Sequence, residues 1–218
     1  MKIFLDSADL GDMESAYKSG VLGGITTNPM SIRGQTDDSA VRHLKKISQF
    51  VEDRGLDVSL HAQVMTLDPE KVVAQAQKIA GELDSKNLVV KIPCSWDNLT
   101  AVRRLSGEGI TVNCTAVVAA GQALMASAAG ARYVSLLASR MEEAGINIPE
   151  TIATVVPTLD DAGAEIIVEN IRPTHNITDF AQAGAHVAAL PLHLLTSISD
   201  HKKSAEVADS FSEYFIRL

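Results

Sequence analysis

The chain has 218 residues, with 19 lysines and arginines against 27 aspartates and glutamates, so its formal net charge is −8. An acidic balance without a basic cluster argues against nucleic acid or an anionic membrane surface as the partner, because both bind clustered lysine and arginine. A hydrophobic share of 46% with 21% charged residues predicts one globular domain, and a small molecule is the expected partner.

The sequence shows no metal-binding motif, no signal peptide and no membrane-spanning segment. Cys94 and Cys114 lie in apolar runs and form no Cys-x-x-Cys pair, and the six histidines show no metal-ligand spacing. The first apolar run ends at Asp6, which is too short for a signal peptide, and no segment approaches the roughly 18 apolar residues that cross a bilayer. We therefore expect a cytoplasmic protein without a metal site.

Short stretches rich in β-branched residues alternate with amphipathic stretches along the chain. The eight predicted strands cover residues 2–5, 24–27, 58–64, 87–92, 111–117, 133–138, 165–171 and 186–191. The predicted helices cover residues 9–19, 39–53, 68–83, 97–106, 118–129, 149–162, 177–182 and 192–199. Strict alternation predicts parallel strands, and eight units predict a single α/β domain over residues 1–218, a (β/α)8 TIM barrel. A doubly wound sheet is the competing fold, but no Gly-x-Gly-x-x-Gly fingerprint follows a strand.

Two segments depart from the regular repeat. Pro157 lies inside the predicted helix 149–162, where it removes a backbone hydrogen bond, so we expect a kink or two short helices there. Residues 204–218 form an additional C-terminal helix after the barrel is complete. We expect this helix to pack outside the barrel or on a neighbouring subunit, because it has an apolar face made of Val207, Phe211, Tyr214, Phe215 and Leu218.

Lys91 is the most informative residue, because it interrupts the otherwise apolar strand 87–92. Desolvation lowers the pKa of a lysine, and an unprotonated amine can form an imine with a ketone. The structural alternative is a lysine with a buried stem whose ammonium reaches water or pairs with Asp6. His61, in the third strand, is expected to be a neutral, hydrogen-bonded core residue.

Polar residues also end most of the other strands, where barrel enzymes carry their active sites. An imine-forming lysine needs acid, base and hydrogen-bonding partners. The early strands supply candidates at Asp6, Thr26, Asn28, Gln63, Asn113 and Thr115. Structural alternatives remain open, because Asp6 can cap the first helix and Asn28 can form a turn with Pro29.

The later strands carry candidates for binding an anionic group of the substrate, which barrels of this kind hold on that side. These candidates are Arg140, Asn170 and Arg172. The alternative is that they form surface ion pairs with Glu142, Glu143 or Glu169.

Five motifs resemble, in order, those of the small transaldolases and fructose-6-phosphate aldolases. They lie at residues 4–8, 24–29, 89–93, 109–115 and 122–131, so the resemblance covers nearly the whole chain. The elements Thr-Thr-Asn-Pro (residues 26–29) and Val-Lys-Ile-Pro (residues 90–93) are together specific to that family. The resemblance implies a class I aldolase mechanism, with a Schiff base on Lys91 and without a metal or organic cofactor.

The resemblance also implies roles for the other residues. Lys91 would attack the C2 carbonyl of a sugar phosphate, Asp6 would remove the C4 hydroxyl proton, and Gln63 and Thr115 would hold a water that transfers protons. The substrate-binding set would be Thr26, Asn28, Asn113, Ser135, Arg140, Asn170 and Arg172, in which Asn28 and Asn113 orient the dihydroxyacetone fragment. Transfer of that fragment to an aldose phosphate is transaldolase activity, whereas its release is fructose-6-phosphate aldolase activity.

Departures from the family pattern leave the choice of activity open. Gln63 resembles the aldolase branch, whereas Asn113 and Ser135 resemble the transaldolase branch. Leu137 stands where the aldolase branch has a tyrosine, which favours transfer. Asn170 stands where the family has serine, so the bound group can be phosphate, another anion such as a sulfonate, or absent.

Two further alternatives remain. An imine-forming aldolase of the deoxyribose-phosphate kind uses a second lysine, which strands five to eight lack. A non-catalytic sugar-phosphate-binding barrel is the other alternative. The family commonly forms pentamers or pairs of pentamers with the last helix on a neighbour, so the resemblance implies a homo-oligomer, pentamer or decamer.

Overall fold

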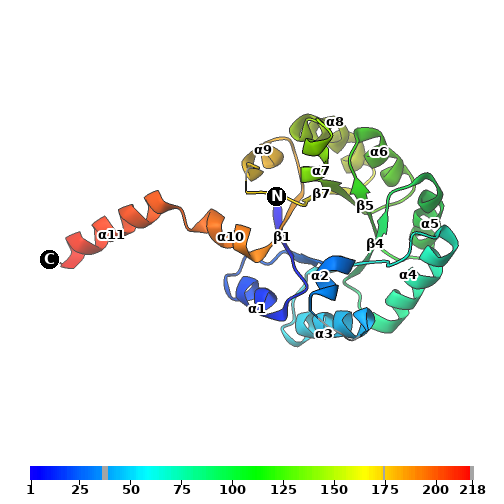
Figure 1. The fold of residues 1–218 in the computed structure, drawn as a ribbon, viewed down its shortest axis with the longest axis horizontal. Coiled ribbons are helices and arrows are strands. Elements are labelled where there is room, and N and C mark those ends of the chain that lie inside the picture. The colour runs from blue at the N-terminus through cyan, green and yellow to red at the C-terminus, as the bar shows by residue number, and fades with distance from the viewer. Residues whose placement is uncertain (36–38, 174, 217–218) are drawn as a thin grey trace.

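The fold is a closed barrel of parallel strands, seen in a computed structural model that describes residues 1–35, 39–173 and 175–216, with side chains to residue 212 in the last helix (Figure 1). The strands pair in chain order, and β1 pairs with β8 to close the barrel. The predicted (β/α)8 barrel is therefore confirmed, and the doubly wound alternative is wrong. The strands are β1 (Lys2–Asp6), β2 (Gly24–Thr26), β3 (Ser59–Gln63), β4 (Leu88–Pro93), β5 (Val112–Val117), β6 (Tyr133–Leu137), β7 (Glu165–Glu169) and β8 (Val187–Leu190).

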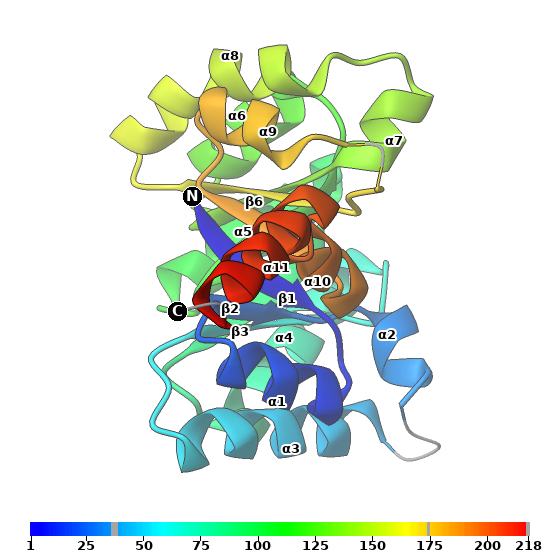
Figure 2. The ribbon, with the colours of Figure 1, turned by 90° about the vertical axis from the view of Figure 1, so that its left-hand side faces the viewer.

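The helices form a ring outside the strands (Figures 1 and 2). Those at the predicted positions are α1 (Leu10–Lys18), α3 (Ala40–Asp53), α4 (Pro69–Leu83), α5 (Trp96–Gly107), α6 (Ala120–Ala128), α8 (Ile148–Asp161), α9 (Ile177–Gln182) and α10 (Leu192–Ser199). Two short helices, α2 (Pro29–Arg33) and α7 (Ala138–Glu143), follow β2 and β6 and are not predicted. Over the described residues, every helix is too short or too polar to span a bilayer.

Asp9 begins α1 by capping it. Its carboxylate accepts hydrogen bonds from the backbone N–H groups of Gly11 and Asp12 at 2.6 and 3.0 Å. These N–H groups have no partner inside the helix, so the cap stabilises its first turn. The cap of α1 is therefore Asp9 rather than Asp6, which leaves the carboxyl of Asp6 free for another role.

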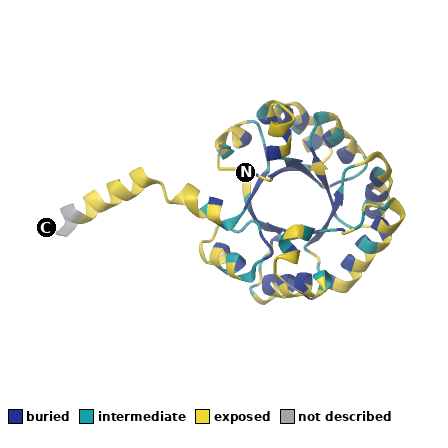
Figure 3. Cartoon of the chain, viewed as in Figure 1, coloured by how far each residue is buried: buried dark blue, intermediate teal, exposed yellow. Residues whose placement is uncertain are grey.

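Alternation along the strands separates two apolar regions. Outward-facing residues such as Leu5 pack against the helices and form the main core, which Figure 3 shows as buried strand and inner helix surfaces. A smaller cluster made of Phe4, Ile167, Val187 and Ala189 is separate from that core. A Cβ on Gly24 would lie 2.4 Å from the ring of Phe4, so this ring occupies the space of a side chain on β2.

Pro157 does not divide α8, which continues through it. Of the two expectations for this segment, two short helices is therefore wrong, and a kink stays a prediction. A proline inside a helix costs about 3 kcal/mol. Each large apolar side chain that becomes buried stabilises the fold by about 1.5–3 kcal/mol. Three such residues of α8 outweigh the cost, namely Ile152, Val155 and Leu159.

The last helix, α11 (Lys202–Ile216), projects away from the barrel (Figure 1). Residues 201–212 are exposed, and Val207 and Phe211 of the predicted apolar face are 43% and 69% exposed. This part of α11 therefore does not pack on its own barrel. The rest of the predicted face lies outside the described side chains, namely Tyr214, Phe215 and Leu218.

Candidate active site

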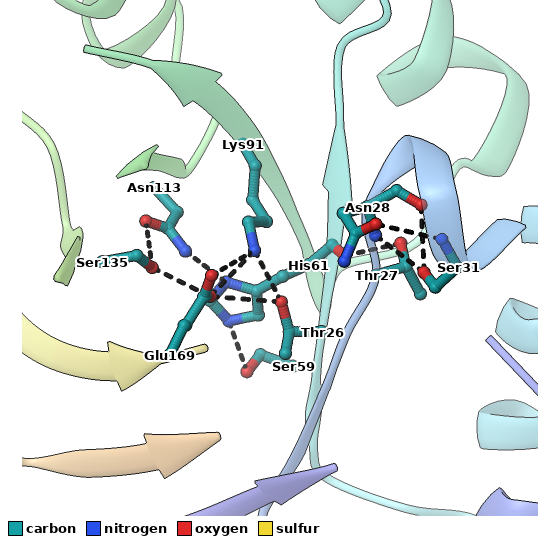
Figure 4. Close-up of polar contacts among 10 residues, drawn as sticks. All are labelled: Thr26, Thr27, Asn28, Ser31, Ser59, His61, Lys91, Asn113, Ser135 and Glu169. Atoms are coloured by element: carbon teal, nitrogen blue, oxygen red, sulfur yellow. Dashed lines mark hydrogen bonds and ion pairs between the residues drawn. The ribbon is translucent and has the colours of Figure 1, made fainter. Parts of the chain in front are cut away.

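Lys91 lies on the inner face of β4 and is only 2% exposed. Its Nζ donates to the Thr26 hydroxyl at 2.8 Å and lies 2.8 and 2.9 Å from the two carboxylate oxygens of Glu169 (Figure 4). The predicted burial of this lysine is therefore confirmed. Its ion-pair partner is Glu169 rather than Asp6, the partner in the structural alternative.

Glu169, the last residue of β7, is the site residue that the sequence analysis missed. The alternative in which Glu169 forms a surface ion pair with an arginine is wrong, because the side chain of Glu169 is buried in the barrel. Its Oε1 also accepts hydrogen bonds from Ser135 at 3.0 Å and from Thr26 at 3.3 Å. Side chains two apart share a face of a strand. Ile167, two residues before Glu169, belongs to the small apolar cluster. The alternation of the strand therefore places the Glu169 carboxylate on the same face as Ile167, and this alternation is the signal that could have identified it.

A hydrogen-bonded chain continues from Glu169 across the barrel (Figure 4). Ser135 also contacts the Asn113 carbonyl at 3.0 Å, and the Asn113 amide lies 3.1 Å from His61 Nδ1. Nδ1 is then the acceptor, so Nε2 carries the proton and donates to Ser59 at 3.0 Å. Burial, and next the charge of Lys91, hold the pKa of His61 well below its usual value. His61 is therefore a neutral core residue, as expected.

Asp6 ends β1 and is half-buried. Burial, and next the charge of Glu169, raise the pKa of Asp6 from 3.8 to about 6, against the opposing charge of Lys91. A carboxyl group with this pKa changes its protonation near neutral pH, which suits a general base. Two carboxyl groups and one amine thus interact electrostatically in the same part of the barrel.

Replacing Asp6 by asparagine is expected to stabilise the fold at pH 7. The wild-type carboxyl must lose its proton against a pKa raised by about 2 units, which costs at most about 3 kcal/mol at 1.36 kcal/mol per unit. Because the folded state binds this proton more tightly, wild-type stability falls as the pH rises from about 4 to 6. Urea unfolding at pH 4 and 7 checks this, and an Asp6→Asn gain that is equal at both pH values would contradict it.

Gln63 and Thr115 lie on the strands either side of β4. Gln63 is the register partner of Lys91, and Thr115 is the register partner of Pro93 two residues further along. Alternation places both on the inner face with Lys91. Their role in holding a water stays a prediction.

Asn28 caps the short helix α2. Its side-chain carbonyl accepts from the N–H groups of Met30 and Ser31, both at 3.0 Å, and its own N–H donates to the Ser31 hydroxyl at 3.0 Å. This reciprocal cap stabilises the helix start at Pro29. Asn28 thus has a structural role, as the cap of a helix rather than in the turn of the alternative interpretation. Among the contacts of the described residues, its side-chain NH₂ group makes none of these bonds and can still meet the predicted contact with substrate.

Of the predicted anion-binding residues, Arg140 lies in α7, whereas Asn170 and Arg172 follow β7. Arg140 pairs with Glu143 at 2.8 Å, whereas Arg172 pairs with Glu142 at 3.2 Å and also with Glu143. The carbonyl of Asn170 accepts from the N–H of Ser139. The surface ion pairs of the alternative interpretation therefore form for Arg140 and Arg172, with Glu142 and Glu143 as their partners. A bound anion would compete with these carboxylates, so anion binding here stays a prediction.

This arrangement supplies an amine, a carboxylate in contact with it and a second carboxyl group nearby. An amine that loses its proton can attack a carbonyl carbon, and carboxyl groups can take and return the protons. Within residues 1–35, 39–173 and 175–216, no three His, Cys, Asp or Glu side chains gather in a way that could hold a metal ion.

Comparisons with known proteins place the chain among related sequences. Residues 3–217 match the family model described as Transaldolase/Fructose-6-phosphate aldolase, which includes the barrel and α11. The "Probable transaldolase" of Thermoanaerobacter sp. (strain X514) is 35% identical over 98% of this chain and 96% of its own length. Those of Exiguobacterium sibiricum and Desulfotalea psychrophila are 34% and 33% identical, each over 97% of this chain and 96% of its own length.

Proposed function

The chain belongs to the transaldolase/fructose-6-phosphate aldolase family of enzymes, and from this premise we propose that it transfers a dihydroxyacetone unit from a ketose phosphate to an aldose phosphate. The observation that carries the proposal is the buried amine of Lys91, which is held among polar groups of the barrel interior and within electrostatic reach of Asp6. The names of the relatives, probable transaldolases, favour the same activity.

In the proposed cycle, the amine of Lys91 attacks the C2 carbonyl of the ketose, and loss of water gives an iminium ion. This ion draws the electrons of the C3–C4 bond toward itself, so the bond breaks as Asp6 takes the proton of the C4 hydroxyl. The aldose formed leaves, and an enamine remains on the lysine. The enamine then attacks the aldehyde carbon of an acceptor, and Asp6 returns its proton to the new hydroxyl oxygen. Addition of water to the new iminium releases the product ketose and restores the amine of Lys91.

Leu137, the last residue of β6, supports transfer over release. Its side chain has no hydroxyl to hold the water that protonation and hydrolysis of the enamine require. Gln63 is the feature that favours release, through its resemblance to the aldolase branch. The second candidate function is therefore fructose-6-phosphate aldolase activity.

A coupled assay separates the candidates. With fructose 6-phosphate as donor, we expect glyceraldehyde 3-phosphate to form quickly only when erythrose 4-phosphate is added, with little free dihydroxyacetone. Equal rates with and without the acceptor, together with equimolar dihydroxyacetone, would show an aldolase. Absence of turnover under both conditions would support a non-catalytic sugar-phosphate-binding barrel.

We also propose that α11 packs on a neighbouring copy of the chain in a homo-oligomer. Its face at Val207 and Phe211 is exposed in one chain, and exposed apolar faces of this kind commonly mark contacts between proteins. An apolar groove of about 280 Å³ lies beside α1 and α10 and is a surface that such a helix can cover; its apolar lining includes Val21, Leu192, Leu195 and Ile198.

Phe211→Asp is expected to dissociate this oligomer, because a charge cannot be buried in an apolar contact without a partner. Ala205→Asp is the matched control. It adds the same charge to α11 six residues earlier, about 120° away from Phe211 around the helix. Light scattering after gel filtration measures the mass, and an unchanged mass for Phe211→Asp would contradict the proposal.

A further inference from the structure

The ion pair between Lys91 and Glu169 lies in the interior of the barrel, where the two side chains are 2% and 8% exposed. Removing both charges from water costs several kcal/mol per ion, and apolar residues of similar volume often stabilise a fold at least as well. Stability alone therefore does not account for this pair. The contact of both carboxylate oxygens with Nζ points to the chemistry of that nitrogen.

The carboxylate of Glu169 is held in position by hydroxyl groups. Its Oε1 accepts from Ser135 at 3.0 Å and from Thr26 at 3.3 Å, while Oε2 lies 2.9 Å from the nitrogen of Lys91. Because these contacts come from β2, β4 and β6, they fix the carboxylate against the amine from three sides of the barrel. An acid–base group has to be within hydrogen-bond reach of the proton it moves, and Glu169 meets this condition (Figure 4).

We propose that Glu169 is a catalytic residue of imine formation, which takes a proton from the Lys91 ammonium and returns it to the hydroxyl that leaves as water. The inference rests on the proposed function, since it concerns the imine on the same lysine.

The proposed proton transfers balance without another reagent. The ammonium of Lys91 gives one proton to Glu169, and the nitrogen lone pair forms the C–N bond to the ketone carbon. One of the two protons left on nitrogen moves to the alkoxide, which gives a carbinolamine. Glu169 then protonates this hydroxyl, the C–O bond breaks with its electron pair on the departing water, and the nitrogen lone pair completes the C=N bond. An ammonium and a ketone thus become an iminium ion and water, and the carboxylate is restored.

The two carboxyl groups then have separate tasks. After water leaves, the iminium ion keeps a positive charge, and Glu169 stays as its counter-ion. The negative charge of Glu169 also helps to raise the pKa of Asp6 to about 6, so Asp6 is free to exchange the substrate's hydroxyl proton. Two carboxyl groups in one active site commonly divide the acid and base work in this way.

The titratable groups around the pair matter for its proton exchange in the range pH 7–9. Cys94, which follows β4, changes charge at the edge of this range, because a hydrogen bond with Cys114 lowers its pKa to about 7. Cys94 packs on the main core outside the strands, and it is present in wild type and in both glutamine variants compared below, so it does not separate them. Asp6 of β1 changes protonation near pH 6, and His61 of β3 stays neutral because its pKa is well below 6.5. The remaining polar groups that contact or flank the pair in the described structure have no charge to lose in this range: Thr26 of β2, Gln63 of β3, Asn113 and Thr115 of β5, and Ser135 of β6.

The test measures how fast borohydride traps the dihydroxyacetone adduct in wild type, Glu169→Gln and Glu165→Gln. Glu165 is the matched control, because it lies on the same strand and pairs with Lys2 and Arg132 instead of Lys91. We expect a rate that hardly changes between pH 7 and 9 in wild type and Glu165→Gln, because the proton exchange is internal. The trapping rate of Glu169→Gln should be lower than that of wild type by about 10²-fold or more at pH 7. As the pH rises from 7 to 9 this rate should fall further, by up to about tenfold per pH unit, because the departing hydroxyl must take its proton from solvent.

The sign of the effect separates this role from a purely structural one. If Glu169 only held the amine in its charged form, Glu169→Gln would free the amine and speed adduct formation. An equal or faster rate in Glu169→Gln therefore overturns the inference and leaves the proposed function intact. Absence of any adduct in wild type overturns the proposed function and this inference together.

Wild type alone also provides a test if Glu169→Gln does not fold, as judged by circular dichroism and gel filtration. An internal proton acceptor predicts a flat wild-type rate between pH 7 and 9. A wild-type rate that changes about tenfold per pH unit in this window would show that solvent supplies or removes the proton, and would overturn the inference.

Discussion

Lys91→Met is expected to lower turnover of a ketose phosphate by about 10⁴-fold or more, because the chain then lacks the amine that forms the imine. Methionine is unbranched and apolar, so it can fill the space of the buried lysine stem. Lys86→Met is the matched control, since this lysine is exposed and precedes the same strand. Turnover is measured with the coupled assay, and a Lys91→Met variant as active as Lys86→Met would refute the role of this lysine.

Loss of activity in Lys91→Met has to be separated from loss of fold. The change leaves Glu169 buried without its cation, and breaking a buried ion pair costs about 3–5 kcal/mol. The double variant Lys91→Met/Glu169→Gln removes both charges and is expected to recover part of the free energy of unfolding while it stays inactive. Urea unfolding of both variants shows whether inactivity follows the missing amine or the destabilised barrel.

Asp6→Asn is expected to keep imine formation and to lose cleavage of the C3–C4 bond by about 10²–10⁴-fold, the usual contribution of a general base. Asparagine has the same shape but cannot accept the hydroxyl proton. Trapping with dihydroxyacetone and borohydride should therefore still modify Lys91, while turnover of fructose 6-phosphate falls. Asp57→Asn, an exposed change in the loop before β3, is the control. Full turnover in Asp6→Asn would assign the base to another residue.

The pH dependence gives a second view of Asp6. A base works in its ionised form, so kcat/KM of the wild type should fall below about pH 6, the pKa to which Asp6 is raised. The charge of Glu169 contributes to this raised pKa, so the fall should move to lower pH in any Glu169→Gln activity that remains. An acid limb that keeps its position in Asp6→Asn would contradict the assignment.

The barrel could be predicted because each strand and each longer helix carries its own pattern. The eight strands differ from the predicted ranges by one or two residues at their ends, which hydrogen bonding between strands decides. The helices α2 and α7 have only five and six residues, too few for a helical period to show. The continuity of α8 through Pro157 depends on tertiary packing, which local propensity does not report.

The site could be predicted in part. Lys91 interrupts an apolar strand, and its burial follows from that position alone. The direction of the Glu169 side chain is harder to predict. The polar residues Asn170 and Arg172 follow it, so this part of the sequence resembles a strand that ends at the surface. Whether a residue points into or out of a barrel depends on the register, and a shift of one residue reverses the answer.

The partners of the arginines could not be chosen from sequence either. Arg140 and Arg172 meet near the same carboxylate, Glu143, only because α7 begins directly after β6. A predicted strand through residue 138 leaves no helix there to carry Glu143. Sequence patterns thus identify charged residues near the barrel mouth, but the ion pairs among them follow from the path of the backbone.

The most direct test of the catalytic lysine is to incubate the wild-type chain with dihydroxyacetone, reduce it with borohydride and map the modified residue by peptide mass spectrometry. We predict one reduced dihydroxyacetone adduct, on the peptide that contains Lys91. An unmodified Lys91, or an adduct spread over exposed lysines such as Lys86, would contradict the proposed imine chemistry.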